Sequence, residues 1–219
     1  MKYIIMCGGR YRDFEMPKHL TPIHGEPLVA RTIRLLRQNG VEDIAISSND
    51  SRFEQFGVPV LRHYNDYELS HHQHWQTGTW LSGFYKTEDP VCYLFGDVVF
   101  SPAAIKTIVE TETNDVEFFA STESDEKYEK NYLKLWAEPF AFKVQNVGHF
   151  WDSIELAKKW DAERRFLRHP VSWELWQVIK GTPLNKIDYT NYTAINDYTC
   201  DLDTPEEARD YENIIPKGD

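Results

Sequence analysis

Short apolar segments alternate with helix-like segments over the first 121 residues, and this alternation limits the fold more than any other feature of the sequence. Expected strands cover residues 3–7, 43–47, 91–95 and 117–121, with the clearest expected helices at 26–39 and 101–111. Continuously apolar strands are buried on both faces, as in a parallel sheet covered by helices. The sequence therefore predicts a three-layer α/β/α sandwich with a mostly parallel, mixed sheet.

The second half of the chain is less regular but contributes further elements. Expected strands cover 141–144, 187–189 and 198–202, and expected helices cover 150–160 and 172–179. A Thr-Pro-Glu-Glu segment at 204–207 has the capping residues that begin a last helix. We find no linker or internal repeat, so the 219 residues are expected to form one domain with halves at 1–121 and 122–219.

Charge and composition exclude several classes of partner. The formal net charge is −11, which argues against a general nucleic-acid or anionic-membrane binder. No apolar stretch approaches the roughly 20 residues that a membrane helix needs, and no secretory signal opens the chain. Cys7, Cys92 and Cys200 lie in or beside apolar runs, which is typical of buried thiols in a reducing compartment. We therefore expect a cytoplasmic protein.

A basic, glycine-containing loop follows the first expected strand. Gly8 and Gly9 allow close backbone approach to a phosphate, because successive N–H groups can form an anion-binding nest. Arg10, Arg12 and Lys18 follow and could donate charge-assisted hydrogen bonds to phosphate oxygens. The alternative interpretation is a glycine turn followed by a solvated loop.

Aspartates stand at two predicted strand ends. Asp97 follows the strand at 91–95, while Asp201 and Asp203 lie between the last strand and the last helix. In open α/β sheets, the ligand crevice lies outside the carboxyl ends of the strands. Mg²⁺ prefers a few hard oxygen ligands together with substrate phosphates. The sequence thus predicts Mg²⁺ on Asp97 and Asp203, with Asp201 as the alternate; a turn residue and helix-start electrostatics are the plainer interpretations.

Two motifs in the first fifty residues resemble a known superfamily. An apolar strand leads into Cys-Gly-Gly-Arg at 7–10, and Pro-Lys-His-Leu at 17–20 precedes Gly-Glu-Pro-Leu at 25–28. These segments are similar to the signature of the sugar-phosphate nucleotidyltransferase superfamily. The resemblance returns at 76–79, 96–97 and 201–207 and is weak elsewhere, mainly over 125–196.

The resemblance implies an enzyme that transfers NMP from an NTP to a small phosphorylated acceptor, such as a sugar phosphate, and releases pyrophosphate. It implies Mg²⁺ as cofactor, an NTP-binding half at 1–121 and an acceptor-binding half at 122–219. Catalytic roles would fall to Lys18, Arg10 and Arg12, nucleotide contacts to Cys7, Gly8, Gly9, Gln76, Gly78 and Thr79, and metal ligation to Asp97 and Asp203. Among small single-domain members, CTP or UTP is favoured as the donor, in nucleotide-sugar synthesis. A homodimer is left open.

Two rival functions remain open at this level. A nucleotide-sugar glycosyltransferase of similar fold usually carries Asp-x-Asp at the strand end, whereas Val98 and Val99 follow Asp97 here. A nucleotide-binding regulator without activity is the second rival. Tyr11 keeps it open, because the superfamily usually has another glycine at that position.

Other polar and aromatic residues are weaker candidates. Lys143 ends an apolar strand and is a candidate contact for an acceptor phosphate. The histidines at 71, 72 and 74 lack the further ligands of a zinc site and are interpreted as a solvated loop. Trp80 is expected in the core, with base stacking as the alternative. The late tryptophans, Trp151, Trp160, Trp173 and Trp176, are expected to pack, with a role in lining the acceptor pocket as the alternative.

Overall fold

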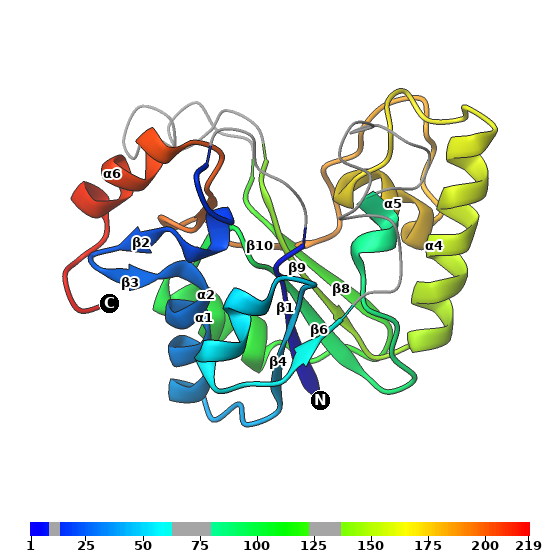
Figure 1. Cartoon of the computed structure of the whole chain (residues 1–219). Helices are drawn as coiled ribbons and strands as arrows, with labels where there is room; N and C mark the ends of the chain where they lie inside the picture. Colours follow the sequence, from blue (N-terminus) through cyan, green and yellow to red (C-terminus); the bar gives the residue numbers. More distant parts are fainter. Residues whose placement is uncertain (9–13, 63–79, 123–136) are drawn as a thin grey trace.

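A seven-stranded mixed sheet forms the centre of the protein (Figure 1). The computed structural model describes residues 1–8, 14–62, 80–122 and 137–219. In spatial order the strands are β10 (Thr193–Ala194), β8 (Val116–Ala120), β9 (Pro139–Val144), β6 (Val91–Phe95), β1 (Lys2–Met6), β4 (Ile44–Ser47) and β5 (Val60–Leu61). β1 is parallel to β4 and β6, whereas β9 is antiparallel to β6 and β8.

Helices cover both faces of this sheet. α1 (Leu28–Gln38) and α2 (Pro102–Glu110) lie on one side, and α4 (Val147–Ala162) and α5 (Ser172–Lys180) lie on the other (Figure 1). Short 3₁₀ turns η1 (Lys18–Leu20), η2 (Ser51–Phe56) and η3 (Trp80–Gly83) connect them to the strands. The predicted α/β/α sandwich with a mostly parallel, mixed sheet is confirmed.

The helix starts follow the predicted capping chemistry. The Ser101 hydroxyl accepts a hydrogen bond from the Ala104 N–H at 2.9 Å, and Pro102 opens α2. At the start of α6 (Pro205–Ile214), Thr204 and Glu207 form the reciprocal capping box. Both helices therefore begin where local sequence alone places them.

One predicted strand is wrong. Residues 187–189 form no strand; the edge strand β10 lies a few residues later and pairs with β8 through Thr193 and Phe119. Tyr189 instead packs edge-on against Trp173, with ring centroids 4.7 Å apart. Burial against an aromatic partner outweighs local strand propensity here.

Aromatic side chains fill the layer between the sheet and the helices α4 and α5. Phe118 of β8 stacks on Phe142 of β9 at 4.5 Å between ring centroids. Trp173 and Trp176 of α5 both contact the Phe118 ring and are 3% and 1% exposed. Packing is thus the main role of these two tryptophans, as the sequence predicts. The thiols of all three cysteines are also buried.

The Lys143 side chain, from β9, caps the C-terminal end of α2. Its Nζ donates to the carbonyl oxygens of Ile108, Val109 and Thr111 at 3.0, 2.9 and 2.6 Å, where α2 ends. It lies opposite Cys92, near the amino end of β6, whereas Asp97 follows the carboxyl end of β6. This placement contradicts the prediction that Lys143 contacts an acceptor phosphate, because its donors satisfy carbonyls that the helix leaves unpaired.

We expect Lys143→Met to lower the free energy of unfolding by about 2–4 kcal/mol, because three buried carbonyls lose a charged donor. Urea unfolding measures this loss. The control is Lys106→Met on the exposed face of α2, where the Lys106–Glu110 pair is largely solvated and its loss costs less than about 0.5 kcal/mol. An equally small change in Lys143→Met would contradict the capping role.

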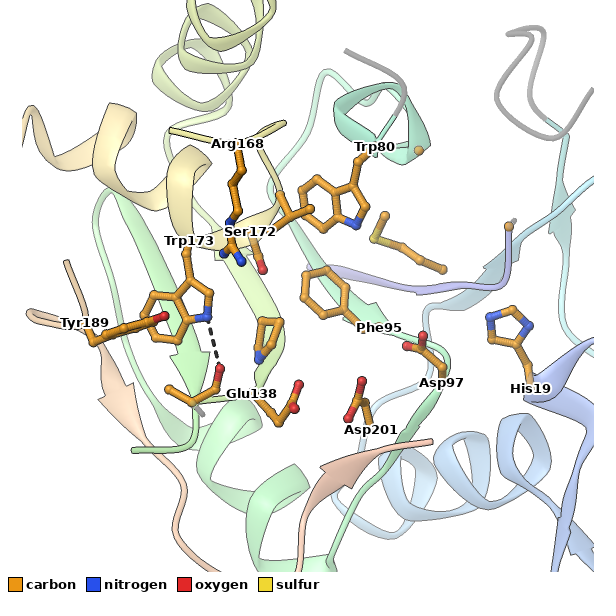
Figure 2. Close-up of a pocket in the computed structure, with 16 residues that line it drawn as sticks. His19, Trp80, Phe95, Asp97, Glu138, Arg168, Ser172, Trp173, Tyr189 and Asp201 are labelled. Atoms are coloured by element: carbon orange, nitrogen blue, oxygen red, sulfur yellow. Dashed lines mark hydrogen bonds between the residues drawn. The ribbon is translucent and has the colours of Figure 1, made fainter. Parts of the chain in front are cut away.

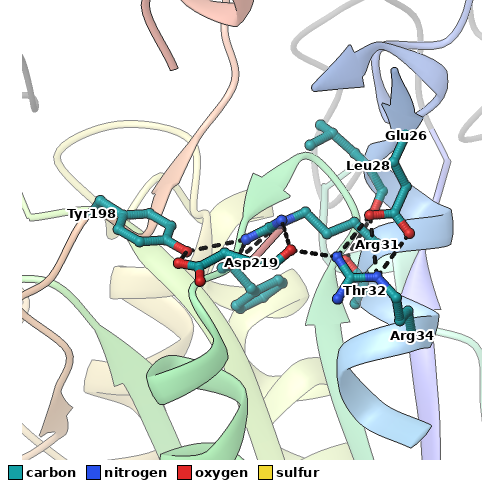
Figure 3. A network of polar contacts seen from close by, with 8 residues as sticks. Glu26, Leu28, Arg31, Thr32, Arg34, Tyr198 and Asp219 are labelled. Atoms are coloured by element: carbon teal, nitrogen blue, oxygen red, sulfur yellow. Dashed lines mark hydrogen bonds and ion pairs between the residues drawn. The ribbon is translucent and has the colours of Figure 1, made fainter. Parts of the chain in front are cut away.

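A polar network joins the last residues to α1 (Figure 3). The Arg31 guanidinium is 4% exposed and donates to the carbonyl of Asp219, to the carbonyl of Phe100 and to the Tyr198 hydroxyl. Arg34 holds Glu26 and also reaches Asp219. These contacts tie Tyr198 and Asp219, which lie before and after α6, to α1. Among the described helices, none has the length and apolarity that a membrane span needs.

Candidate active site

The site lies where β1 and β6 end. Gly8 follows β1, and Asp97 follows β6. Asp97 leads into the short strand β7 (Val98–Val99), which pairs antiparallel with β11 (Cys200–Asp201). Asp201 lies opposite Val98 in this pairing, so a segment a hundred positions away in the sequence reaches the same sheet edge.

Lys18 joins the two carboxylates that the sequence singles out. Its Nζ lies 2.7 Å from Asp97 Oδ2 and 3.7 Å from Asp203 Oδ1, and its side chain is 8% exposed. η1 presents Lys18 from the segment between β1 and α1. The structure thus brings Lys18, Asp97 and Asp203 together at one point.

Opposite charges keep Lys18 and Asp97 ionised. Burial lowers the pKa of Lys18, but Asp97, Asp201 and Asp203 more than offset that effect, so the pKa lies above its ordinary value. Burial raises the pKa of Asp97, but the charge and the hydrogen bond of the neighbouring Lys18 outweigh it, so that pKa lies below its ordinary value. His19 is 1% exposed, and burial lowers its pKa to about 4, which keeps the imidazole neutral at pH 7. The Lys18–Asp97 ion pair is therefore fully formed at neutral pH.

Gly96 allows these elements to approach. A Cβ on Gly96 would lie 2.5 Å from the Met6 carbonyl oxygen, 2.8 Å from Cys7 Sγ and 2.9 Å from His19 Cδ2. The Gly96 N–H also donates to the Met6 carbonyl at 3.0 Å. Only glycine fits between β1 and η1 here. The sequence gives no prediction of this close approach. The only local indication is that Gly96 stands between a buried strand and Asp97.

We expect Gly96→Ala to lower the free energy of unfolding by about 1–3 kcal/mol through overpacking and to lower activity as Asp97 shifts. Urea unfolding and steady-state kinetics measure both effects. Gly148→Ala is the control, because the nearest atom beyond its chain neighbours, Asn146 Oδ1, would be an ordinary 3.8 Å from the new Cβ. Full activity and stability in Gly96→Ala would show that the close approach is dispensable.

A cavity of about 330 Å³ opens from the carboxylates towards α5 (Figure 2). Its lining residues come from both halves of the chain: Met6, Gly8, His19, Trp80, Gly83, Phe95, Asp97, Ala137, Glu138, Pro139, Arg168, Val171, Ser172, Trp173, Tyr189 and Asp201. Trp80 also packs edge-on against Phe95, so this partly buried ring lines the cavity and packs against the core. Of the late tryptophans, Trp173 also lines the cavity, as the alternative interpretation held. The sequence did not point to Arg168, Glu138 or Ser172, because their shared location depends on long-range packing.

The carboxylates fit a small divalent cation. Figure 2 shows Asp97 and Asp201 with their carboxylates towards the cavity, and Asp203 shares Lys18 with Asp97. Within the described ranges, no group of three or more acidic, histidine or cysteine ligands forms a ready-made metal cage. Mg²⁺ is usually held by one or two carboxylates plus substrate oxygens, so this donor set suits it.

The remaining predicted residues are placed as follows. Gly8 lines the cavity, and the Cys7 N–H donates to the Ser47 carbonyl at 2.9 Å while its thiol packs beneath Gly96. Predicted residues that lie outside the described ranges are Gly9, Arg10, Tyr11, Arg12, His71, His72, His74, Gln76, Gly78 and Thr79.

Solved structures of other proteins superpose on nearly the whole chain. A proposed glucose-1-phosphate thymidylyltransferase from Bacillus anthracis superposes with a TM-score of 0.57 at 15% identity, over 100% of this chain and 97% of that one. The inositol-1-phosphate CTP transferase from T. maritima gives 0.52 at 16% identity, over 99% and 96%. CMP:2-keto-3-deoxy-manno-octonic acid synthetase gives 0.51 at 17% identity, over 97% and 98%. At these identities the likeness is one of fold.

Sequence comparison gives the family. No curated protein sequence matches the chain. Residues 3–175 match the MobA-like NTP transferase domain, which includes β1, the Lys18 turn, Asp97 and most of the cavity wall. The chain belongs to the MobA-like NTP transferase domain family.

Proposed function

We propose that this protein is a Mg²⁺-dependent nucleotidyltransferase that joins the NMP of an NTP to a small phosphorylated acceptor, such as a sugar phosphate. The observation that carries the proposal is the contact of Lys18 with both Asp97, which lines the cavity, and Asp203. A cation between Asp97, at the carboxyl end of the parallel strand β6, and Asp203, just after β11, is suited to phosphate chemistry.

The reaction needs positioning and charge neutralisation more than proton transfer. An acceptor phosphate is already an anion at neutral pH, so its oxygen can attack the α-phosphorus as the bond to the β-phosphate oxygen breaks and pyrophosphate leaves. The barrier is the approach of two polyanions. Lys18, held by Asp97, is proposed to donate to phosphate oxygens at the reacting centre, and Arg10 and Arg12 are proposed to hold the leaving pyrophosphate.

Asp97 and Asp203 are the proposed metal ligands, with Asp201 as the alternate for the second position. Bound Mg²⁺ would neutralise phosphate charge at this end of the cavity. Gly8 and Gly9 are proposed to offer backbone N–H groups to the triphosphate, and Gln76, Gly78 and Thr79 to contact the base and ribose. CTP or UTP is the proposed donor, and the cytoplasm, where NTPs are available and thiols stay reduced, is the proposed compartment.

A pyrophosphate-release screen tests the proposal. The purified chain is incubated with Mg²⁺, each of the four NTPs in turn and pooled phosphorylated metabolites. We expect pyrophosphate only when NTP and acceptor are both present, with the highest rate for CTP or UTP and none after chelation of Mg²⁺. Nucleotide binding without pyrophosphate release would favour a silent regulator, and release of a nucleoside diphosphate from a nucleotide sugar would favour a glycosyltransferase.

A further inference from the structure

The cavity has ends of opposite charge. Asp97 and Asp201 lie at one end, and Arg168 lies at the other with its guanidinium towards the cavity (Figure 2). Arg168 belongs to the segment between α4 and α5, in the part of the chain where the sequence gives no motif. A cation at the opposite end of the cavity from Asp97 is not needed for phosphate transfer itself, so its position calls for a separate explanation.

One ion pair holds the Arg168 side chain in place and engages only its Nε donor. Its Nε donates to Glu174 Oε1 at 2.6 Å, and the other oxygen of Glu174 accepts from the Val171 N–H at 3.0 Å. Glu174 is 4% exposed, whereas the Arg168 side chain is 50% exposed. Its Nη1 and Nη2 make no hydrogen bond to any residue in the described ranges. Four N–H donors of a positioned guanidinium are therefore available to a ligand.

Ser172 adds a second polar group next to Arg168. It is the first residue of α5, is 1% exposed and lines the cavity. Its Oγ has no hydrogen-bond partner among the described residues, although buried hydroxyls nearly always have one. Glu174 accepts the Val171 N–H at the start of α5, and the first turn of the helix presents Ser172 and Trp173 to the cavity at the positive end of the helix dipole. A guanidinium, a helix N-terminus and an unsatisfied hydroxyl together favour an oxyanion.

Flat aromatic walls lie between the two charged ends. The Trp173 indole N–H donates to the Ala137 carbonyl at 3.1 Å, which fixes the ring, and Tyr189 packs against it edge-on. Trp80 and Phe95 line the wall nearer to Asp97. Rigid aromatic faces suit the apolar face of a ring-shaped molecule such as a sugar.

We propose that Arg168, Ser172 and the N-terminus of α5 form a subsite, the Arg168 subsite, for a second anionic group on the acceptor. The inference rests on the proposed function and narrows the acceptor to a ring-bearing phosphate that has a carboxylate or a second phosphate at its far end. The ring lies along the aromatic walls, its reacting phosphate faces Lys18 and its distal anion faces Arg168. The subsite thereby selects which phosphorylated compounds are used.

Binding of simple anions tests the subsite without turnover. ¹⁵N NMR of the full chain follows the backbone amides of Ser172 and Trp173 and the Trp173 indole during titration with methyl phosphate and, separately, with acetate. We expect saturable shifts, with the tighter anion identifying the distal group. Arg168→Gln should weaken this binding at least about tenfold, and Ser172→Ala should weaken it less without lowering stability.

Arg165→Gln is the matched control, since the Arg165 side chain is also 50% exposed but packs over Trp160, away from the cavity lining. Its anion binding should equal that of the wild type. Shifts that do not saturate, or that are the same in Arg168→Gln and wild type, would overturn the subsite and leave Arg168 as a helix-capping residue only. Ser172→Ala keeps the test decisive if Arg168→Gln proves unstable, because unchanged anion binding in Ser172→Ala would also count against the subsite.

Kinetics with paired acceptors provide the second readout. Glucose 1-phosphate is compared with glucuronic acid 1-phosphate and glucose 1,6-bisphosphate for binding and for pyrophosphate release. We expect the doubly anionic compounds to bind at least about tenfold more tightly than glucose 1-phosphate, and Arg168→Gln to abolish that preference. Anion binding without turnover would refute the proposed function and leave the subsite standing. Turnover with no preference for a second anion would support the proposed function and refute the subsite.

Discussion

Asp97→Asn is expected to lower kcat by about 10²- to 10³-fold or more, the largest effect of any single substitution at this site. The change keeps the shape of the side chain but removes the charge that pairs with Lys18 at 2.7 Å and that is proposed to hold Mg²⁺. Unfolding free energy should fall by only about 1–3 kcal/mol, because Lys18 still faces Asp203. Pyrophosphate release measures the rate, and circular dichroism and urea unfolding show that the chain remains folded.

Three companion variants sharpen this prediction. Asp210→Asn, exposed on α6, is the control and should keep the wild-type rate. Asp203→Asn should resemble Asp97→Asn, while Asp201→Asn should cost less if Asp203 is the second metal ligand. Unchanged turnover in Asp97→Asn would remove the metal assignment. A larger loss of rate in Asp201→Asn than in Asp203→Asn would make Asp201 the second metal ligand.

Lys18→Met is expected to lower kcat by about 10²-fold or more while changing the Kd for NTP by less than about fivefold. The Lys18 side chain is 8% exposed and its ammonium lies between two carboxylates, so it is positioned before substrate arrives and can stabilise charge that develops in the transition state. Single-turnover kinetics and nucleotide titration separate the two quantities.

Lys143→Met is the matched control for this experiment, because Lys143 is 7% exposed and is also a buried lysine, but it caps α2 at the other end of β6. It should lose stability and keep kcat at temperatures where it is folded. A Lys18→Met variant that loses only affinity would contradict a transition-state role and make Lys18 a ground-state binding residue.

The local chemistry of the chain predicted much of the fold. Val91–Phe95 is a strand with the predicted bounds because five consecutive apolar residues suit a strand buried on both faces. α2 and α6 begin at their predicted caps because Ser101 and Thr204 satisfy N–H groups within the next turn. Residues 187–189 form no strand, and Tyr189 packs instead on Trp173, a contact that no local pattern shows.

The site was predictable only where a motif marks it. Lys18, Asp97 and Asp203 stand in segments that resemble a superfamily signature, and the structure places them together. The charge of Lys143 suggested a ligand, but its real partners are carbonyls at the end of α2 that no sequence pattern indicates. Arg168 comes to the cavity because it precedes α5, which Trp173 anchors on Phe118 of β8 and on the Ala137 carbonyl. Residues whose role depends on such packing leave no local signal.

The most direct test is a crystal structure of the chain with Mn²⁺ and a non-hydrolysable NTP analogue, because the anomalous signal of Mn²⁺ locates the metal. The account predicts metal at the head of the cavity, with carboxylate oxygens of Asp97 and Asp203 within about 2.3 Å of it and Lys18 beside the phosphates. Metal and triphosphate bound elsewhere, with Asp97 and Asp203 contacting neither, would contradict it.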